Sequence, residues 1–219
     1  MERYGEFCRM HILVIAATKF EIEPLIAGNI SVEINITGVG VPSTLYQLQK
    51  KIYTHRPGLI IQAGIAGSFT NDVPLSKVVL VKQDVFADIG MEEEGKFTPL
   101  FKTGLADNDG PVTNGWLVNP SHIFNMFKLP AVKAITVNKI SDSVLQNKQA
   151  ICNFAPQIES MEGAALHYVC LHENIPFIQI RSISNQVGER DKSKWKMKEA
   201  ISNLNIELTK LIDQISNEK

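Results

Sequence analysis

The sequence predicts an α/β fold: a single domain in which helices flank a mixed central β-sheet. The first observation is that apolar runs typical of strands alternate with segments of helical spacing. The second is that several of these runs are continuously apolar, as in strands buried on both faces. The third is the length, because 219 residues suffice for one sizeable core. We expect the domain to span residues 1–219, with residues 1–9 as a flexible N-terminal extension.

The first half of the chain is expected to contain four strands and two helices. Pro24 lies near the first turn of the first helix, where its missing N–H costs little. The strand GLIIQAGIAG is expected to run into a glycine turn, and the acidic segment DIGMEEEGKF to form a loop. The predicted strands are residues 11–17, 31–38, 58–67 and 77–87, and the predicted helices are residues 19–28 and 41–56.

The second half is expected to begin with a loop, because residues 99–120 are rich in Gly, Asn, Asp and Pro. The last helix has one apolar stripe, formed by Met197, Ile201, Leu204, Leu208 and Leu211. The predicted strands here are residues 131–138, 157–161 and 176–184. The predicted helices are residues 146–154, 162–174 and 193–217.

Composition excludes several classes of function. The net charge of −1 gives no basic footprint for nucleic acid. The apolar run HILVIAA is too short to span a bilayer and lacks the cleavage pattern of a signal peptide. Three widely spaced cysteines, without CxxC spacing, are typical of reduced thiols in a cytosolic protein. We therefore expect a cytoplasmic protein that binds neither membranes nor nucleic acids.

The glycine-rich segment GIAGSF follows a predicted buried strand. Backbone N–H groups around Gly64, Ala66 and Gly67 could hold the oxygens of a ligand that approaches closely. The segment matches neither GxxxxGK[ST] nor GxGxxG, so it does not indicate a nucleotide phosphate loop. The alternative is an ordinary tight turn.

Two glutamates follow predicted strands. Glu162 lies where a strand meets a helix rich in small residues, and a carboxylate at a helix N-terminus is stabilised by the helix dipole. Its functional alternative is to accept hydrogen bonds from two sugar hydroxyls. Glu21 follows the first strand, where it is either a surface acid, like Glu23, or a catalytic one.

Four motifs occur in an order that resembles the nucleoside phosphorylase and nucleosidase family, in particular its 5′-methylthioadenosine/S-adenosylhomocysteine nucleosidases. The motifs are AATKFEIEPL, QAGIAGSF, ESMEGAA and RSISNQVGERDKSKW. The resemblance extends from His11 to about Leu211. It implies a nucleoside phosphorylase-like fold, a small-molecule nucleoside as substrate, and a homodimer or larger homo-oligomer.

The resemblance also implies roles for single residues. In that family a glutamate after the first strand activates water, and Glu21 takes that place. The glutamate of a Met-Glu pair binds the ribose hydroxyls, which matches Glu162, with Met161 beneath the sugar. In the Arg-x-x-Ser-Asp motif, Arg181 helps to orient the catalytic carboxylate or water, and Ser184 contacts the substrate. Gly64, Ala66 and Gly67 would line the substrate site.

Asn185 departs from that motif, in which an aspartate protonates the purine at N7. A 6-aminopurine offers a donor at N6 and an acceptor at N7, which a protonated aspartate matches. A 6-oxopurine offers two acceptors, O6 and N7, and an asparagine NH₂ supplies donors without a charge. A site with the wrong pattern leaves buried polar groups unpaired, and discrimination can reach about 10⁴. Asn185 therefore favours hypoxanthine or guanine over adenine; the alternative is an asparagine in a turn.

The nucleophile is expected to be water. Phosphorylases of this family hold phosphate with arginines, and the sequence has no arginine near Gly64 and Ile65. No His/Asp/Glu cluster has the spacing of metal ligands, so neither a metal nor a cofactor is expected. The alternatives that stay open are an adenine-type nucleosidase, a 6-oxopurine phosphorylase, and a nucleoside-binding protein without catalysis.

Arg190 and Trp195 follow Asn185 in the most specific of the four motifs. Within the family, this motif resembles those of enzymes whose substrate carries an anionic aromatic side arm at its 5′ end. A cation beside an aromatic ring suits such an arm. The alternative is that both residues belong to the start of the last helix, with Trp195 in the core.

Overall fold

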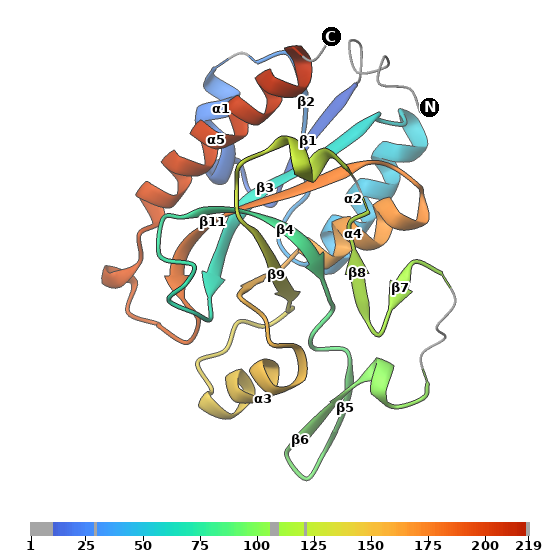
Figure 1. Ribbon diagram of the computed structural model, residues 1–219, viewed down its shortest axis with the longest axis vertical. Coiled ribbons are helices and arrows are strands. Elements are labelled where there is room, and N and C mark those ends of the chain that lie inside the picture. Colours follow the sequence, from blue (N-terminus) through green and yellow to red (C-terminus); the bar gives the residue numbers. More distant parts are fainter. Residues whose placement is uncertain (1–10, 29, 106–109, 121, 218–219) are drawn as a thin grey trace.

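The computed structural model describes residues 11–28, 30–105, 110–120 and 122–217, so the expected extension at residues 1–9 lies outside it. Within these residues, nine strands form one mixed sheet (Figure 1). Its path runs β2-β1-β3-β10-β9-β4-β8-β7, and β11 pairs with both β3 and β4. As a result the strands β3, β10, β9, β4 and β11 pair in a closed ring. The predicted mixed sheet is confirmed, and its closure is a feature that the local patterns did not indicate.

The central strands are buried because their sequences are apolar throughout. In β1 all five residues are buried, and β1 pairs in parallel with β2 and β3. The long strand β11 runs parallel to β3 and antiparallel to β4. The strands are β1 (Ile12–Ala16), β2 (Glu33–Ile36), β3 (Leu59–Ser68), β4 (Val78–Asp84), β9 (Ala131–Thr136), β10 (Ile158–Ser160) and β11 (Phe177–Gln186).

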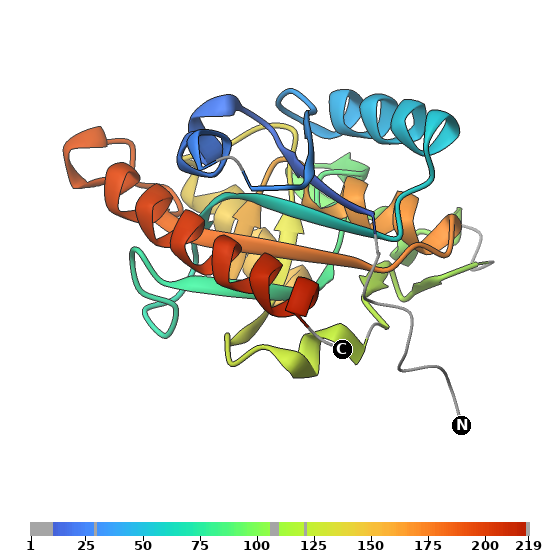
Figure 2. The same ribbon diagram turned by 90° about the horizontal axis from the view of Figure 1, so that it is seen from above.

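Helices cover both faces of the sheet, and Figure 2 shows α2 and α5 on opposite sides of the strands. Leu48 of α2 and Leu166 of α4 share one apolar cluster with Phe177. Leu204 and Leu208 of α5 pack on the other side. The helices are α1 (Glu23–Ala27), α2 (Val41–Thr54), α3 (Val144–Phe154), α4 (Gly163–His172) and α5 (Met197–Asn217). None of the helices described combines the length and apolar character needed to cross a bilayer.

Three predicted elements were wrong in detail. GIAGS is not a turn, because β3 continues through it to Ser68 and pairs there with β10 and β11. The acidic segment forms a hairpin of β5 (Gly90–Glu93) and β6 (Lys96–Pro99), whose two turn residues have positive φ. The last helix begins at Met197, and a 3₁₀ turn, Lys192–Lys194, precedes it.

The expected loop at residues 99–120 also contains regular structure in its described part. A 3₁₀ turn, Leu100–Lys102, is followed by β7 (Val112–Thr113) and β8 (Trp116–Val118). These two strands pair as a hairpin around Asn114 and Gly115, both at positive φ. Through β8 the hairpin joins β4 at the edge of the main sheet.

Candidate active site

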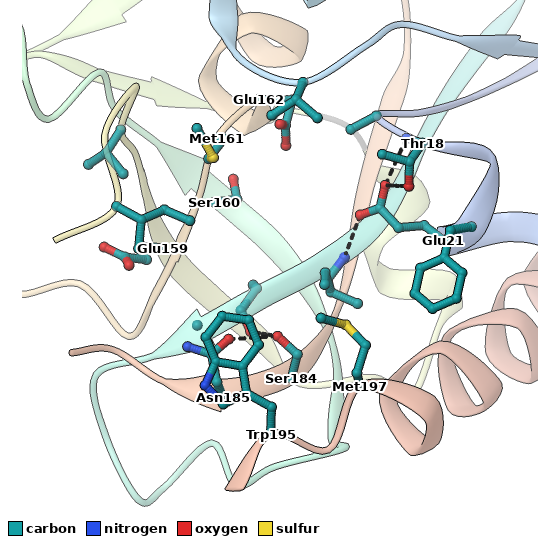
Figure 3. Close-up of a pocket in the computed structure, with 18 residues that line it drawn as sticks. Thr18, Glu21, Glu159, Ser160, Met161, Glu162, Ser184, Asn185, Trp195 and Met197 are labelled. Carbon is teal, nitrogen blue, oxygen red and sulfur yellow. Dashed lines mark hydrogen bonds between the residues drawn. The ribbon is translucent and has the colours of Figure 1, made fainter. Parts of the chain in front are cut away.

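A cavity of about 290 Å³ lies where the ends of β1, β10 and β11 meet β3 (Figure 3). This places it beyond the carboxyl ends of parallel strands, where open α/β sheets bind ligands. All four sequence motifs contribute to its wall. Its polar lining is Thr18, Glu21, Glu159, Ser160, Glu162, Ser184 and Asn185, and its larger apolar side chains are Phe20, Val39, Ile65, Val137, Ile140, Met161, Trp195 and Met197.

Glu21 is buried in a 3₁₀ turn, Lys19–Ile22, that directly follows β1. The backbone N–H and the hydroxyl of Thr18 both donate to its Oε2, each at 3.0 Å. The backbone N–H of Ile65 donates to Oε1 at 3.1 Å. Three donors therefore fix the orientation of this carboxylate, which lines the cavity instead of facing solvent as a surface acid would.

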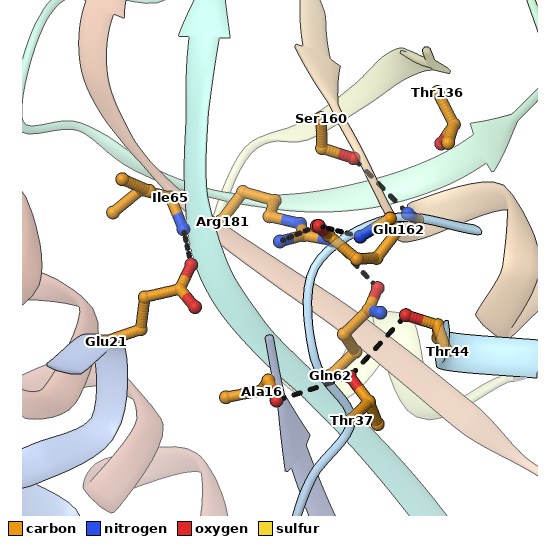
Figure 4. Close-up of polar contacts among 12 residues, drawn as sticks. Ala16, Glu21, Thr37, Thr44, Gln62, Ile65, Thr136, Ser160, Glu162 and Arg181 are labelled. Carbon is orange, nitrogen blue, oxygen red and sulfur yellow. Dashed lines mark hydrogen bonds and ion pairs between the residues drawn. The ribbon is translucent and has the colours of Figure 1, made fainter. Parts of the chain in front are cut away.

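Glu162 is the N-cap residue of α4, and only 5% of it is exposed. The backbone N–H of Gly40 donates to Oε1 at 3.0 Å, and Oε2 lies 3.8 Å from Nη1 of Arg181 (Figure 4). Burial raises the pKa of Glu162, and the Arg181 guanidinium acts in the opposite direction. The carboxylate is thus supported at a helix N-terminus and by a cation behind it.

Arg181 is 1% exposed and does not line the cavity. Its Nη2 donates to Oε1 of Gln62 at 2.8 Å, and its Nη1 lies where a side chain on Gly64 would begin. Gly64 therefore does not line the cavity either. Its missing side chain makes room for Arg181 and Glu21, whose Oε1 lies 2.9 Å from the same point. Arg181 supports Glu162 directly, and it lies beside Gly64 in space although far from it in sequence.

Asn185 reaches the cavity through an irregularity in β11. The pairing register with β3 shifts between Ile183 and Asn185, as in a β-bulge, a feature that often re-aims a side chain beside an active site. The hydroxyl of Ser184 donates to Asn185 Oδ1 at 2.7 Å, and Asn185 Nδ2 donates to the carbonyl of Gln186 at 2.9 Å. One hydrogen of the amide NH₂ is therefore left to donate to a ligand.

Glu159 lines the cavity, although none of the sequence motifs predicted a role for it. It is 8% exposed, and burial raises its pKa to about 7. Burial is the sole cause of this shift, and no residue that the structure describes donates a hydrogen bond to the carboxylate. A signal was present, because a glutamate in a three-residue buried strand, IES, is unusual for an interior position.

The remaining predicted residues divide into two groups. Ala66, Gly67 and Met161 line the cavity, and their contact with a substrate stays a prediction. Trp195 also lines it, partly exposed, and its Nε1 donates to the carbonyl of Glu189 at 3.0 Å, so it is not a core residue. Arg190 is exposed and does not belong to the lining, and its contact with a side arm stays a prediction.

A buried polar layer lies behind Glu162. Asp84 is fully buried, which raises its pKa to about 7, and its Oδ1 accepts from the hydroxyl of Thr136 at 3.0 Å. A side chain on Gly163 would overlap Asp84 and Gln179. The glycine in MEGAA is therefore required by this layer, which packs directly under the first turn of α4.

The charge of the cavity bears on its nucleophile. Three carboxylates line it, and none of the described lining residues is Lys, Arg or His.

The described parts of the chain hold no cluster of three or more His, Cys, Asp or Glu that could bind a metal. Burial raises the pKa of the Cys170 thiol well above its usual range, which makes it a poor nucleophile.

Comparison with known proteins identifies the family. The family model described as the phosphorylase superfamily matches residues 15–215. A futalosine hydrolase of Thermus thermophilus is 29% identical over 144 residues, which are 64% of this chain and 63% of that protein. A futalosine hydrolase of Streptomyces coelicolor is 26% identical over 159 residues, covering 70% and 64% of the two chains. The matched region thus spans less than two thirds of either curated relative.

Solved structures share the fold over nearly the whole chain. A futalosine hydrolase mutant of Helicobacter pylori superposes with a TM-score of 0.80 at 14% identity, covering 94% of this chain and 100% of that one. A mutant of the 5′-methylthioadenosine/S-adenosylhomocysteine nucleosidase of the same organism, with 5′-methylthioadenosine in the active site, gives 0.79 at 16% identity, covering 94% and 99%. At these identities the likeness supports the fold alone.

Proposed function

Because this chain belongs to the phosphorylase superfamily, we propose that it is an N-ribosyl hydrolase that cleaves futalosine. Futalosine is an inosine with a carboxybenzoyl side arm at its 5′ end. The products would be hypoxanthine and dehypoxanthine futalosine, in the futalosine route to menaquinone. The two curated relatives named as futalosine hydrolases support this substrate.

The observation that carries the proposal is the pairing of Glu21 and Glu162 in a cavity whose described lining has no cation. Phosphate carries negative charge and would meet carboxylates without a bidentate partner. Arg181 does not supply one, because its guanidinium is buried against Gln62 and Glu162. Water, which is neutral, suits this cavity as nucleophile.

The reaction then proceeds by a dissociative displacement at C1′. As the bond between C1′ and N9 breaks, positive charge develops on the sugar as in glycoside hydrolysis. The Glu21 carboxylate, held by Thr18 and Ile65, accepts a proton from the attacking water, whose oxygen bonds to C1′. The electron pair of the broken bond leaves with the purine, where the free hydrogen of the Asn185 amide stabilises it. The departing base then takes up a proton from solvent to become hypoxanthine, and Glu21 releases the proton that it accepted.

Glu162 holds the sugar for this step. Its carboxylate keeps acceptor capacity beyond the bonds from Gly40 and the contact with Arg181, and the ribose 2′- and 3′-hydroxyls are donors. Met161, beside it, supplies an apolar surface beneath the sugar.

One assay distinguishes this function from its rivals. The protein is incubated with futalosine, inosine and 5′-methylthioadenosine, with and without phosphate, and the released base and sugar are identified. We expect hypoxanthine from futalosine, a sugar with a free 1-hydroxyl, and no increase in rate with phosphate. A ribose 1-phosphate product would indicate a phosphorylase, preferential release of adenine an adenine-type nucleosidase, and binding without turnover a binding protein.

A further inference from the structure

The carboxylate of Glu159 lines the cavity and accepts no hydrogen bond from the residues that the structure describes. Its strand, β10, pairs with the far end of β3 and with β9, and only 8% of the residue is exposed. A buried charge without a hydrogen bond costs free energy, and such a group in a native structure calls for a missing partner. A ligand in the cavity would supply it.

The position of Glu159 relative to Gly67 shows which part of a nucleoside it would meet. A side chain on Gly67 would begin 3.1 Å from Cγ2 of Val187, 3.4 Å from Nδ2 of Asn185 and 3.5 Å from Cγ of Glu159. The side chains of Asn185 and Glu159 therefore both pass close to Gly67, and Figure 3 shows both residues on the side of the cavity away from Glu21.

The other carboxylate groups gather farther back along β3. Glu21 and the guanidinium that supports Glu162 both lie beside Gly64. Three residues of a strand span about 10 Å, which is of the order of the distance from the ribose hydroxyls to the N1 edge of the purine in a nucleoside. Glu21 and Glu162 thus face the sugar, while Asn185 and Glu159 face the base.

The two base-side groups have complementary chemistry. An amide NH₂ donates, which suits O6 or N7 of a 6-oxopurine, and an ionised carboxylate only accepts. The 6-oxopurine ring carries a hydrogen on N1, whereas N1 of a 6-aminopurine is itself an acceptor. We propose that Glu159 determines base specificity by accepting a hydrogen bond from N1–H of the 6-oxopurine, an inference that rests on the proposed function.

The electrostatics of Glu159 support this role. Burial raises its pKa to about 7, and a bound N1–H donor would favour the ionised form. The charged groups that line cavities on its two sides are Glu21 and Glu162, with Asp88, Glu92 and Lys139 in a neighbouring cavity of about 350 Å³. Below about pH 7 the protonated carboxyl can donate to N1 of a 6-aminopurine, so discrimination against that base should weaken as the pH falls.

Glu159→Gln tests the proposal at constant shape. The amide can turn either its oxygen to N1–H or its NH₂ to a bare N1, so it should serve both bases. The measurement is the ratio of kcat/KM for futalosine and for its 6-amino analogue at pH 8. We expect the ratio to fall by about 10- to 100-fold, the effect of one unpaired buried group. The matched control is Glu92→Gln, the same change at an exposed glutamate, which should keep the wild-type ratio.

A second measurement does not depend on turnover. Calorimetry with free hypoxanthine and 1-methylhypoxanthine should show at least about 10-fold weaker binding of the methylated base, since it lacks the N1–H. Glu159→Ala should remove most of that difference. Because no described residue donates a hydrogen bond to Glu159, both variants are expected to melt at or above the wild-type temperature.

The outcomes separate this inference from the function on which it rests. Suppose that the wild type releases hypoxanthine from futalosine, and that substitution of Glu159 changes neither the kcat/KM ratio of the two nucleosides nor the affinity ratio of the two free bases. The role of Glu159 is then overturned, and the proposed function stands. If the wild type cleaves no nucleoside but prefers hypoxanthine through Glu159, the proposed reaction fails and the base-reading role stands. Equal binding of both bases by the wild type overturns the inference in either case.

Discussion

At the scale of single residues, the three cavity glutamates differ in what donates to them. Glu21 accepts three hydrogen bonds from the protein, and Glu162 accepts one and faces a buried cation. Glu159 accepts none from the described residues, and burial alone raises its pKa. A carboxylate that the protein holds in a fixed orientation, such as Glu21, suits proton transfer from a positioned water. A carboxylate without protein donors, such as Glu159, suits a hydrogen bond from the ligand.

Replacing Glu21 by Gln should lower kcat for futalosine by about 10²- to 10⁴-fold, the usual contribution of a general base. The amide keeps the shape but cannot accept the proton of the attacking water. Steady-state rates give kcat, and binding of substrate to the variant should persist. Glu23→Gln, an exposed glutamate two residues away, is the matched control. Near-normal turnover in the Glu21 variant would remove it from the mechanism.

Replacing Asn185 by Asp should lower activity on futalosine by about 10²-fold or more, since unpaired buried groups cost about 1–3 kcal/mol each. An ionised aspartate would repel O6 and N7 of the base, and also the Gln186 carbonyl to which the amide now donates. Some activity toward the 6-amino analogue should appear at lower pH, where the carboxyl is protonated. The readout is the ratio of kcat/KM for the two bases, and an unchanged ratio would mean that Asn185 does not contact the purine.

At the scale of elements, the site is organised by β3 and the strands that pair with it. Its two glycines leave room for different side chains. Glu21 and Arg181 lie where a side chain on Gly64 would begin. Asn185 and Glu159 pass close to Gly67. The bulge in β11 then turns Asn185 toward Gly67. A strand that carries no side chains at two points can thus bring four polar groups close to its backbone.

Gly64→Ala tests this arrangement. The new methyl would overlap Arg181 and begin 2.9 Å from Oε1 of Glu21, so both side chains must move. We expect kcat to fall by about 10²-fold or more, as for a displacement of about 1 Å in a catalytic group, together with a lower melting temperature. The control is Gly28→Ala at a helix end, where φ is −76° and the nearest atom would be 3.4 Å away. Equal effects of the two substitutions would contradict the role of Gly64.

At the scale of the whole molecule, closing the ring of strands buries polar groups as well as apolar ones. Asp84 on β4 is fully buried, and its pKa is raised from 3.8 to about 7, chiefly by burial. Between these pH values the folded protein holds a proton that the unfolded chain has released. The contribution of Asp84 to the free energy of unfolding is therefore fully present below about pH 4, and it is lost as the pH rises through about 7.

Asp84→Asn removes that titration while keeping an acceptor for Thr136. The free energy of unfolding, measured by urea denaturation at pH 5 and pH 8, should fall less with pH in the variant than in the wild type. One proton accounts for a difference in slope of up to about 1.4 kcal/mol per pH unit. Asp142→Asn, at an exposed aspartate, should leave the pH dependence unchanged. Parallel curves for wild type and Asp84→Asn would show that Asp84 is ionised throughout.

Local patterns in the sequence predicted the main strands and helices in their observed order, but not the hairpins β5–β6 and β7–β8. Apolar periodicity is a local property, so every strand predicted in residues 11–87 and 131–184 is present. Because the carboxyl ends of parallel strands meet at one edge, Glu21, Glu162 and Asn185 could be assigned to one cavity from their places in the chain. The Asn-Gly pair at residues 114–115 also carried a readable hairpin signal, which the composition of that loop obscured.

The tertiary structure alone decided the features that depend on pairing between distant segments. β3 passes through its glycines as a strand because β10 and β11 supply partners there, which local turn propensity does not register. Arg181 donates to Gln62 because the parallel strands β3 and β11 lie side by side, and Glu162 approaches the same guanidinium from the start of α4. The burial of Glu159 follows from the pairing of β10 with β3 on one side and β9 on the other. The free energy of a buried carboxylate depends on every element packed around it and not on its neighbours in sequence.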